Sequence, residues 1–174
     1  VFNRTALAFA GEDGVAAVSI IMYLQFLFIG VYSGFSIGIA PPLGWAYGEG
    51  KMDVCRKLER YAHRFFAIAP FVIYALTYFL ASAGVSCFVE RSNAVFPIAV
   101  TGMRIYGLGF LFSGINIFAS VRMMAYGKGY FSGMITFLRS FALLLLFLTI
   151  LPQKLGLTGI WLAVPAAEVL TMLV

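Results

Sequence analysis

Hydrophobic residues form long, continuous runs along the chain and do not alternate with polar residues at a period of two. One stretch without a charged residue extends from Gly14 to Gly48. A helix needs about 20 predominantly apolar residues to cross the hydrocarbon core of a membrane, whereas alternation over a few residues would indicate half-buried strands. The pattern therefore predicts an all-α integral membrane protein, built as a polytopic helical bundle.

The same length requirement divides the chain into successive segments. Residues 1–10 are expected to be the tail of one helix, ended by the turn Gly11-Glu12-Asp13-Gly14. Four full spans follow at about residues 15–45, 66–88, 95–121 and 130–151, and a truncated span occupies residues 155–174. Because the sequence starts without Met and stops in an apolar run, we interpret residues 1–174 as a partial transmembrane lobe of a longer protein.

Residues 51–65, KMDVCRKLERYAHRF, have a different pattern from the spans on either side. Val54, Leu58, Tyr61 and Phe65 recur at helical spacing, and basic residues occupy the remaining faces. This distribution is typical of an amphipathic helix that lies in the membrane interface.

Composition strengthens the membrane prediction. Hydrophobic residues make up 62% of the chain and charged residues 11%, and the mean hydropathy is +0.97. Soluble domains usually contain about 25% charged residues. Cys55 and Cys87 lie at opposite ends of one predicted span, which places them far beyond disulfide reach.

Basic residues concentrate in two of the predicted loops. The loop after the first span contains Lys51, Arg56, Lys57, Arg60 and Arg64, and the loop after the third is bounded by Arg122, Lys128 and Arg139. The positive-inside rule therefore places both loops in the cytoplasm and the remaining loops outside. The net charge of +5 is a topology signal on this interpretation, so no nucleic-acid partner is expected.

Prolines and glycines interrupt two of the predicted helices. Pro41 and Pro42, followed by Gly44, lie near the end of the first span, and Pro165 lies in the last span. Proline removes a backbone donor and clashes with the preceding turn, so these positions are candidates for helix breaks that act in gating. The alternative is that membrane helices simply tolerate proline.

Two polar stripes at helical spacing are candidates for the wall of a substrate cavity. They comprise Gln25, Tyr32 and Ser36 on the first span, and Tyr106, Ser113, Asn116 and Ser120 on the third. The same residues could instead form hydrogen bonds between packed helices, which is their commoner use in membranes.

Glu168 is expected near the bilayer midplane, about ten residues into the last span. An ionisable group at that depth is costly and is a candidate for function, here ion coupling. The structural alternative is a hydrogen bond or a salt bridge, for instance to Arg139. Arg104 and Arg139 are interpreted as packing anchors, and His63 as a solvated surface residue.

Several stretches together resemble a known family. They are AGEDGVAAVSI, GIAPPLGWAYGEGK, MRIYGLGFLFSGINIFASVRMMAYGKGYFSGM and ILPQKLGLTGIWLAVPAAEV, in that order. Within them, Pro41, Gly44, Tyr47 and Gly48 match a recurrent Pro-x-x-Gly-x-x-Tyr-Gly pattern. The chain resembles the second six-helix lobe of bacterial multidrug and toxic compound extrusion (MATE) transporters over nearly its whole length.

This resemblance implies an activity and its partners. It implies one lobe of a two-lobe secondary transporter that exports drugs or other organic cations by proton- or sodium-coupled antiport with alternating access. The expected partners are an amphipathic or cationic substrate, membrane lipid and the missing N-terminal lobe, and no cofactor is expected besides the coupling ion. The location would be the bacterial inner membrane, crossed several times.

The family's coupling acids are best attached to the first helix of the first lobe and, in some subgroups, to the seventh and tenth helices. The segment that would be the tenth, residues 95–121, contains no Asp or Glu. A flippase for lipid-linked oligosaccharides from the same superfamily is the alternative function, and it would need several arginines in its cavity. With one histidine and seven acids the chain offers no catalytic constellation, so no enzyme is expected.

Overall fold

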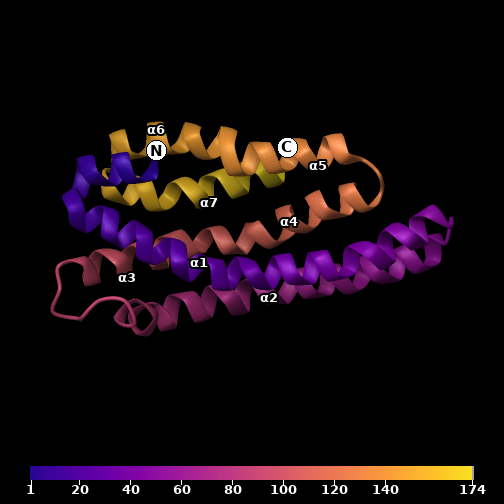
Figure 1. The fold of residues 1–174 in the computed structure, drawn as a ribbon, viewed down its shortest axis with the longest axis horizontal. Coiled ribbons are helices and arrows are strands. Elements are labelled where there is room, and N and C mark those ends of the chain that lie inside the picture. The colour runs from indigo at the N-terminus through magenta and orange to yellow at the C-terminus, as the bar shows by residue number, and fades with distance from the viewer. Residues whose placement is uncertain (174) are drawn as a thin grey trace.

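The structure is a computed structural model, and it describes residues 1–173. In this part of the chain every regular element is helical, which confirms the predicted all-α class. The elements in chain order are α1 (Phe2–Gly48), α2 (Met52–Ser86), α3 (Val95–Tyr106), the 3₁₀ turn η1 (Gly107–Gly109), α4 (Phe110–Ala125), α5 (Gly129–Phe137), the π-helical turn η2 (Leu138–Ala142), α6 (Leu143–Leu155) and α7 (Leu157–Leu173). The long helices run side by side in one elongated bundle (Figure 1).

Helix α1 bends sharply near its start. Gly11 has φ 60° and ψ −152°, a backbone conformation that glycine adopts without the steric penalty of a side chain. Helical geometry resumes at once, so the predicted turn at residues 11–14 is confined to Gly11. The bend folds the first ten residues back beside α6 (Figure 1). Thr5 and Phe9 there share a shallow pocket with Leu148 and Pro152.

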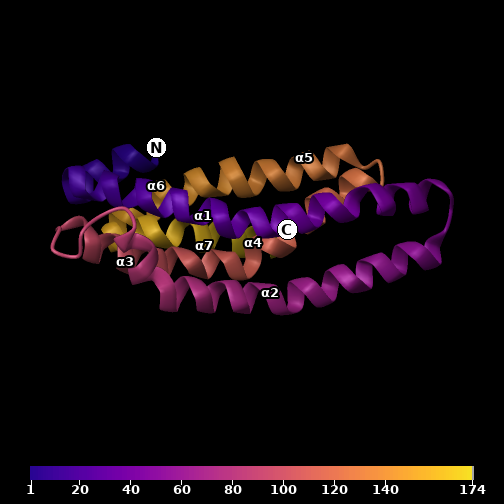
Figure 2. The same cartoon turned by 60° about the horizontal axis from the view of Figure 1, so that its bottom comes forward.

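Helices α1 and α2 form a long antiparallel hairpin, closed by a turn in which Gly50 has φ 71° (Figures 1 and 2). Residues 51–65 were predicted as a separate interfacial segment, but Lys51 caps α2 and residues 52–65 are the start of that helix. No glycine or proline occurs between Met52 and Phe66, so nothing in the sequence ends the helix there. Leu43, Ala46 and Cys55 pack together and hold the end of the hairpin.

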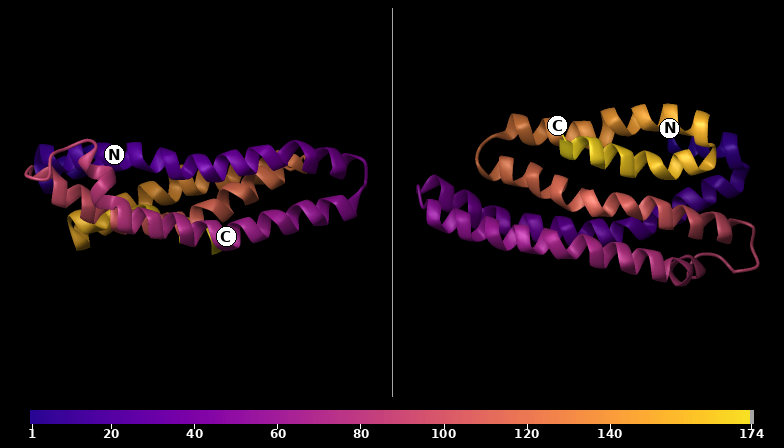
Figure 3. Two further views of the ribbon diagram at one scale, coloured as in Figure 1. Left: turned by 90° about the horizontal axis from the view of Figure 1, so that it is seen from below. Right: turned by 180° about the vertical axis from the view of Figure 1, so that it is seen from behind.

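The next two transmembrane passes each contain a short irregular turn. The run from Val95 to Ala125 is continuous except that η1 tightens to 3₁₀ geometry, and the run from Gly129 to Leu155 widens to π geometry at η2. The chain then reverses direction at Gly156, whose φ is 58°. Helix α7 follows and packs along α6 and α4 (Figure 3).

Helix α4 lies at the centre of the packing and contacts α1, α2, α5 and α7. The Tyr32 hydroxyl donates to the Phe110 carbonyl at 2.9 Å, which ties α1 to α4. Phe66 of α2 packs against Tyr32 and Phe118, with ring centroids 5.9 Å and 5.3 Å apart. Gly114 lies beneath these rings, where a methyl group would come within 2.9 Å of Phe66, so the absent side chain permits this contact.

Four helical runs are long and apolar enough to cross a membrane, namely residues 2–48, 52–86, 95–125 and 129–155. Many large apolar side chains face outward, including Phe79 at 77% exposure and Tyr130 at 80%. Water would penalise such a surface, whereas lipid or a second lobe would not.

The predicted proline breaks at Pro41, Pro42 and Pro165 are not breaks. Helices α1 and α7 continue through all three residues, and the non-helical residue within α1 is Gly11. A proline removes one donor per position, but a long membrane helix retains its remaining hydrogen bonds and its packing. The gating role assigned to these prolines therefore remains a prediction.

Candidate functional site

An ion pair between α7 and η2 lies in the middle of the bundle. Nε of Arg139 donates to both carboxylate oxygens of Glu168 at 3.2 Å, and Nη2 donates to Oε1. The two side chains are only 16% and 7% exposed. Two donor nitrogens on one carboxylate fix the orientation of the guanidinium as well as its position.

Asn116 of α4 completes the surroundings of the carboxylate. Its Nδ2 donates to Oε2 of Glu168 at 2.7 Å and to the backbone carbonyl of the same residue at 2.9 Å. Glu168 is therefore bound from two different elements, and each carboxylate oxygen has a donor. These hydrogen bonds are needed because burying a carboxylate without partners costs several kcal/mol of folding free energy.

The π-helical turn η2 determines where Arg139 points. A π turn adds one residue to a helix, and each residue corresponds to roughly 100° of rotation, so the faces before and after η2 are out of register with a regular helix. Arg139 and its neighbour Ser140 both reach the cavity described below. Arg139 was predicted to be a packing anchor. That prediction is incomplete, because its side chain lines the cavity and binds Glu168.

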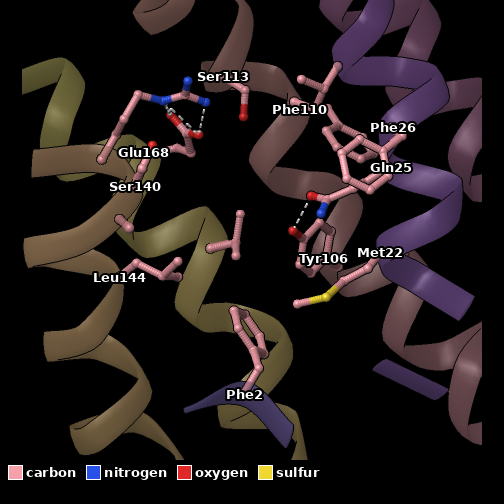
Figure 4. Close-up of a pocket in the computed structure, with 14 residues that line it drawn as sticks. Phe2, Met22, Gln25, Phe26, Tyr106, Phe110, Ser113, Ser140, Leu144 and Glu168 are labelled. Carbon is pink, nitrogen blue, oxygen red and sulfur yellow. Dashed lines mark hydrogen bonds and ion pairs between the residues drawn. The ribbon is translucent and has the colours of Figure 1, made fainter. Parts of the chain in front are cut away.

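A second polar pair faces the ion pair from the other side. The Tyr106 hydroxyl, at the end of α3, donates to Oε1 of Gln25 on α1. Figure 4 shows the two pairs on opposite sides of an open space, with Met22 and Phe26 beside Gln25 and with Ser113 near Glu168.

The space between the two pairs is a cavity of about 340 Å³. Its walls come from α1, α3, α4, η2, α6 and α7, and its lining residues are Phe2, Met22, Gln25, Phe26, Ile29, Tyr106, Phe110, Ser113, Arg139, Ser140, Leu144, Val164, Ala167 and Glu168. Apolar walls with a few oriented polar groups are typical of small-molecule sites, and the volume lies at the small end of their range. The two formal charges in the wall cancel, so the cavity as it stands is neutral.

The structure brings together only part of the predicted cavity residues. Gln25, Tyr106, Ser113 and Glu168 line the space, and Asn116 lies behind it as a ligand of Glu168. These residues come from both predicted polar stripes and from the last span.

The other three stripe residues lie in helix packing instead. Tyr32 bonds to the Phe110 carbonyl, and the buried Ser36 hydroxyl finds no partner within residues 1–173. The Ser120 hydroxyl lies 2.9 Å from the hydroxyls of both Ser132 and Thr136 on α5. The interhelical hydrogen-bonding alternative therefore describes Tyr32 and Ser120. It also holds for Gln25, Tyr106 and Asn116, which form hydrogen bonds between helices at the cavity itself.

The remaining predicted residues do not line the cavity, and this includes Pro165, although its neighbour Val164 does. Pro41 and Pro42 are exposed near the end of α1, and Gly44 marks a close approach of α1 to α4, since a methyl group there would come within 3.2 Å of the Ala125 carbonyl. Arg104 donates from Nε to the Tyr78 carbonyl at 3.3 Å and lies over the Tyr78 ring, which agrees with its interpretation as an anchor.

The sequence analysis did not identify four residues that line the cavity, namely Met22, Phe26, Phe110 and Ser140. Met22 and Phe26 flank Gln25 at helical spacing, so the stripe containing Gln25 could have indicated them. Ser140 reaches the cavity through the π turn, for which the segment LRSFA carries no recognisable signal.

Comparison with known proteins gives a family and a fold. The profile of the MatE family matches residues 2–151. A multidrug resistance MATE family transporter of the MOP superfamily matches in its outward-facing form with a TM-score of 0.89 and 20% identity, over 99% of this chain and 39% of that chain. The inward-facing form of such a transporter matches with a TM-score of 0.89 and 19% identity, over 99% of this chain and 40% of that chain.

The MATE transporter VcmN of Vibrio cholerae, in its bent form, matches with a TM-score of 0.87 and 22% identity, over 98% of this chain and 39% of that chain. The chain thus spans about two fifths of the length of these solved structures, in agreement with the predicted single lobe. No curated protein matches the chain.

Proposed function

The chain belongs to the MatE family, whose members are transporters, and from this premise we propose that the protein is a secondary active antiporter. It exports drugs or other organic cations in exchange for protons or sodium ions, by alternating access. This multi-pass membrane protein would act in the bacterial inner membrane together with an N-terminal lobe, and it would perform no enzymatic reaction. The similarity of this lobe to outward-facing and inward-facing MATE transporters supports alternating access.

The observation that carries the proposal is the carboxylate of Glu168 inside the cavity. A buried carboxylate attracts a cation, and here the cation is part of the protein, namely Arg139. Removing one member of a buried ion pair costs about 3–5 kcal/mol, so Arg139 can leave Glu168 only if another positive charge takes its place. A proton, a sodium ion or a cationic substrate can each supply that charge.

The rest of the cavity suits an amphipathic cation. Phe26 and Phe110 offer aromatic faces, Met22 offers a flexible apolar side chain, and Gln25 offers an amide whose oxygen is held by Tyr106. Aromatic faces attract cations, and methionine adapts to ligands of different shape. This combination favours a site that accepts several related substrates.

The flippase alternative requires a cavity wall rich in arginine. Among the lining residues in the part of the chain that the structure describes, Arg139 is the one arginine, and its charge is already matched by Glu168. An anionic oligosaccharide lipid would meet little free positive charge here. The lining therefore supports the antiporter over the flippase.

Substitution of Glu168 in the full-length protein tests the proposal. Glu168→Gln preserves the shape but cannot ionise, so we expect ion-driven efflux to be lost while drug binding survives. Glu168→Ala would leave Arg139 and Asn116 without their acceptor, at a cost of about 3–5 kcal/mol, and should lower the folded yield. Drug binding, ion-driven efflux and membrane abundance would be measured for both variants.

Glu90→Gln is the matched control, because Glu90 is an exposed acid in a loop away from the cavity. It should behave like the unmodified protein in all three measurements. Efflux at the unmodified level in the Glu168→Gln variant would contradict the coupling role and leave Glu168 with a purely structural one.

A further inference from the structure

A second hollow lies between α2 and α4, on a different face of α4 from the cavity. It has a volume of about 430 Å³ and is lined by His63, Phe66, Ala67, Ile115, Phe118, Ala119 and Arg122. We refer to it as the α2–α4 groove. None of these residues lines the cavity around Glu168, so the groove is a separate feature.

The groove is apolar along most of its length. Phe66 and Phe118 pack against each other with ring centroids 5.3 Å apart and form the floor. Ala67 and Ala119 leave the space open because their side chains are single methyl groups, and Ile115 is 39% exposed at the rim. The two walls belong to predicted membrane spans, so a hydrocarbon chain is the natural neighbour of this surface.

One end of the groove is cationic. Nη1 of Arg122 lies 3.5 Å from Oε1 of Glu59. The Nε of Arg122 is buried and has no hydrogen-bond partner within residues 1–173. Oε1 of Glu59 also accepts the Tyr126 hydroxyl at 2.9 Å. Burial and this hydrogen bond raise the pKa of the Tyr126 phenol, so it remains a neutral donor. The Arg122 side chain is 29% exposed at the end of the groove, so its donors other than the buried Nε can reach a ligand there.

The surrounding surface adds positive charge at the same end. The neighbouring turns of α2 carry exposed basic side chains at Arg56, Lys57, Arg60 and Arg64. The positive-inside rule assigns this end of the bundle to the cytoplasm, where the leaflet contains anionic lipids.

We propose that the α2–α4 groove is a docking site for an anionic phospholipid of the cytoplasmic leaflet. One acyl chain lies along Phe66, Ile115 and Phe118, and the headgroup phosphate accepts from Arg122, with the basic face of α2 around it. A cationic drug would be repelled at this end, and a free phosphate would leave the apolar length of the groove unused. The pairing of an apolar groove with a cationic end is complementary to an anionic phospholipid.

Native mass spectrometry of the purified full-length protein, titrated with phosphatidylglycerol or phosphatidylcholine of the same chain length, tests this proposal. We expect the unmodified protein to retain phosphatidylglycerol preferentially. Ala67→Trp places an indole in the groove from an exposed position and should abolish that preference. Ile68→Trp adds the same indole at the next residue of α2, 65% exposed and outside the groove lining, and should leave it intact.

The charge is tested separately with a second pair of variants. Arg122→Gln should weaken phosphatidylglycerol binding about fivefold, since each basic residue near an anionic lipid contributes about that factor. It should weaken phosphatidylcholine binding less, because the choline cation offsets the charge of that lipid's phosphate. Glu59→Gln removes the neighbouring acid and should keep or strengthen binding. Equal binding of both lipids to the unmodified protein, or full binding to the Ala67→Trp variant, would overturn the proposal. These outcomes do not depend on whether efflux requires Glu168.

Discussion

At the scale of single residues, glycine stands where helices approach each other most closely. At Gly159 in α7, an added methyl group would overlap the backbone carbonyl of Leu151 and lie 2.7 Å from the Pro152 nitrogen. At Gly102 in α3, it would lie 2.8 Å from both Ile21 and the Trp161 ring. Backbone atoms cannot move aside as a side-chain tip can, so the contact at Gly159 tolerates change least.

We therefore predict that Gly159→Ala destabilises the lobe by about 1–3 kcal/mol, because α6 and α7 must separate to admit the methyl group. The midpoint of thermal unfolding of the detergent-solubilised full-length protein would measure this. Gly38→Ala is the control, because nothing lies within 4 Å of the added methyl and alanine favours a helix by about 0.5–1 kcal/mol. Its midpoint should equal or exceed that of the unmodified protein, and an unchanged midpoint for Gly159→Ala would contradict the close crossing.

Part of the candidate site was predictable from the polar stripes in the sequence. Gln25 and Tyr106 share a stripe position with Tyr32 and Ser120, yet only the first two line the cavity. Periodicity shows that polar residues share a face, but it does not show which neighbouring helix covers that face. The partner of Glu168 could be named as an alternative, whereas its position depends on a π turn that no residue pattern announces.

At the scale of helices, proline is a weak guide to interruptions. The irregular turns fall at Gly11, at residues 107–109 and at residues 138–142, and none of these contains a proline. Pro41 and Pro42 lie within a helix that continues to Gly48. A missing donor weakens a helix locally, but flanking turns and lipid keep it formed.

The prolines can still affect transport, since two missing hydrogen bonds make α1 easier to bend. We predict that replacing both Pro41 and Pro42 with Ala leaves the protein inserted and abundant but reduces efflux, because a stiffer helix favours one access state. Both side chains are exposed, so their removal should cost little packing. Efflux per inserted protein would be compared in vesicles.

Pro97→Ala is the control for that experiment. Pro97 is exposed in the first turn of α3, where a backbone N–H has no helical partner, so alanine restores no hydrogen bond. Its efflux should match the unmodified protein. Unchanged efflux in the double variant at equal abundance would show that Pro41 and Pro42 have no gating role.

At the scale of the whole molecule, the two ends of the bundle differ in charge. The turn between α1 and α2 and the turn between α4 and α5 lie at the same end of the bundle (Figure 1). Lys51, Arg56, Lys57 and Lys128 belong to these turns or to the adjacent ends of helices. Such a bias could be read from the sequence because it depends on residue identity and chain order alone, without any knowledge of packing.

The orientation that follows from this charge bias is open to direct measurement. Cysteines placed singly at Lys57 and Lys128 should react with a membrane-impermeant maleimide only from the cytoplasmic side, and cysteines at Glu90 and Lys154 only from outside. All four positions are exposed, so accessibility within the protein does not limit the reaction. The background should carry Ser at both native cysteines, because one of them, Cys87, is itself exposed at the end predicted to lie outside.

The labelling pattern also bears on the lipid site, since the α2–α4 groove meets the cytoplasmic leaflet only in this orientation. Each cysteine variant should be labelled in intact cells and again after the membrane is permeabilised, so that a failure to react from outside is distinguished from a buried thiol. Reaction at Lys57 in intact cells would show that the bundle has the opposite orientation. The basic face of α2 would then lie outside, and the groove would not meet the anionic cytoplasmic leaflet. We expect the cysteine at Glu90 to react in intact cells and the cysteine at Lys57 to react only after permeabilisation. The reason is that the positive charge at the basic end of α2 opposes its transfer across the membrane.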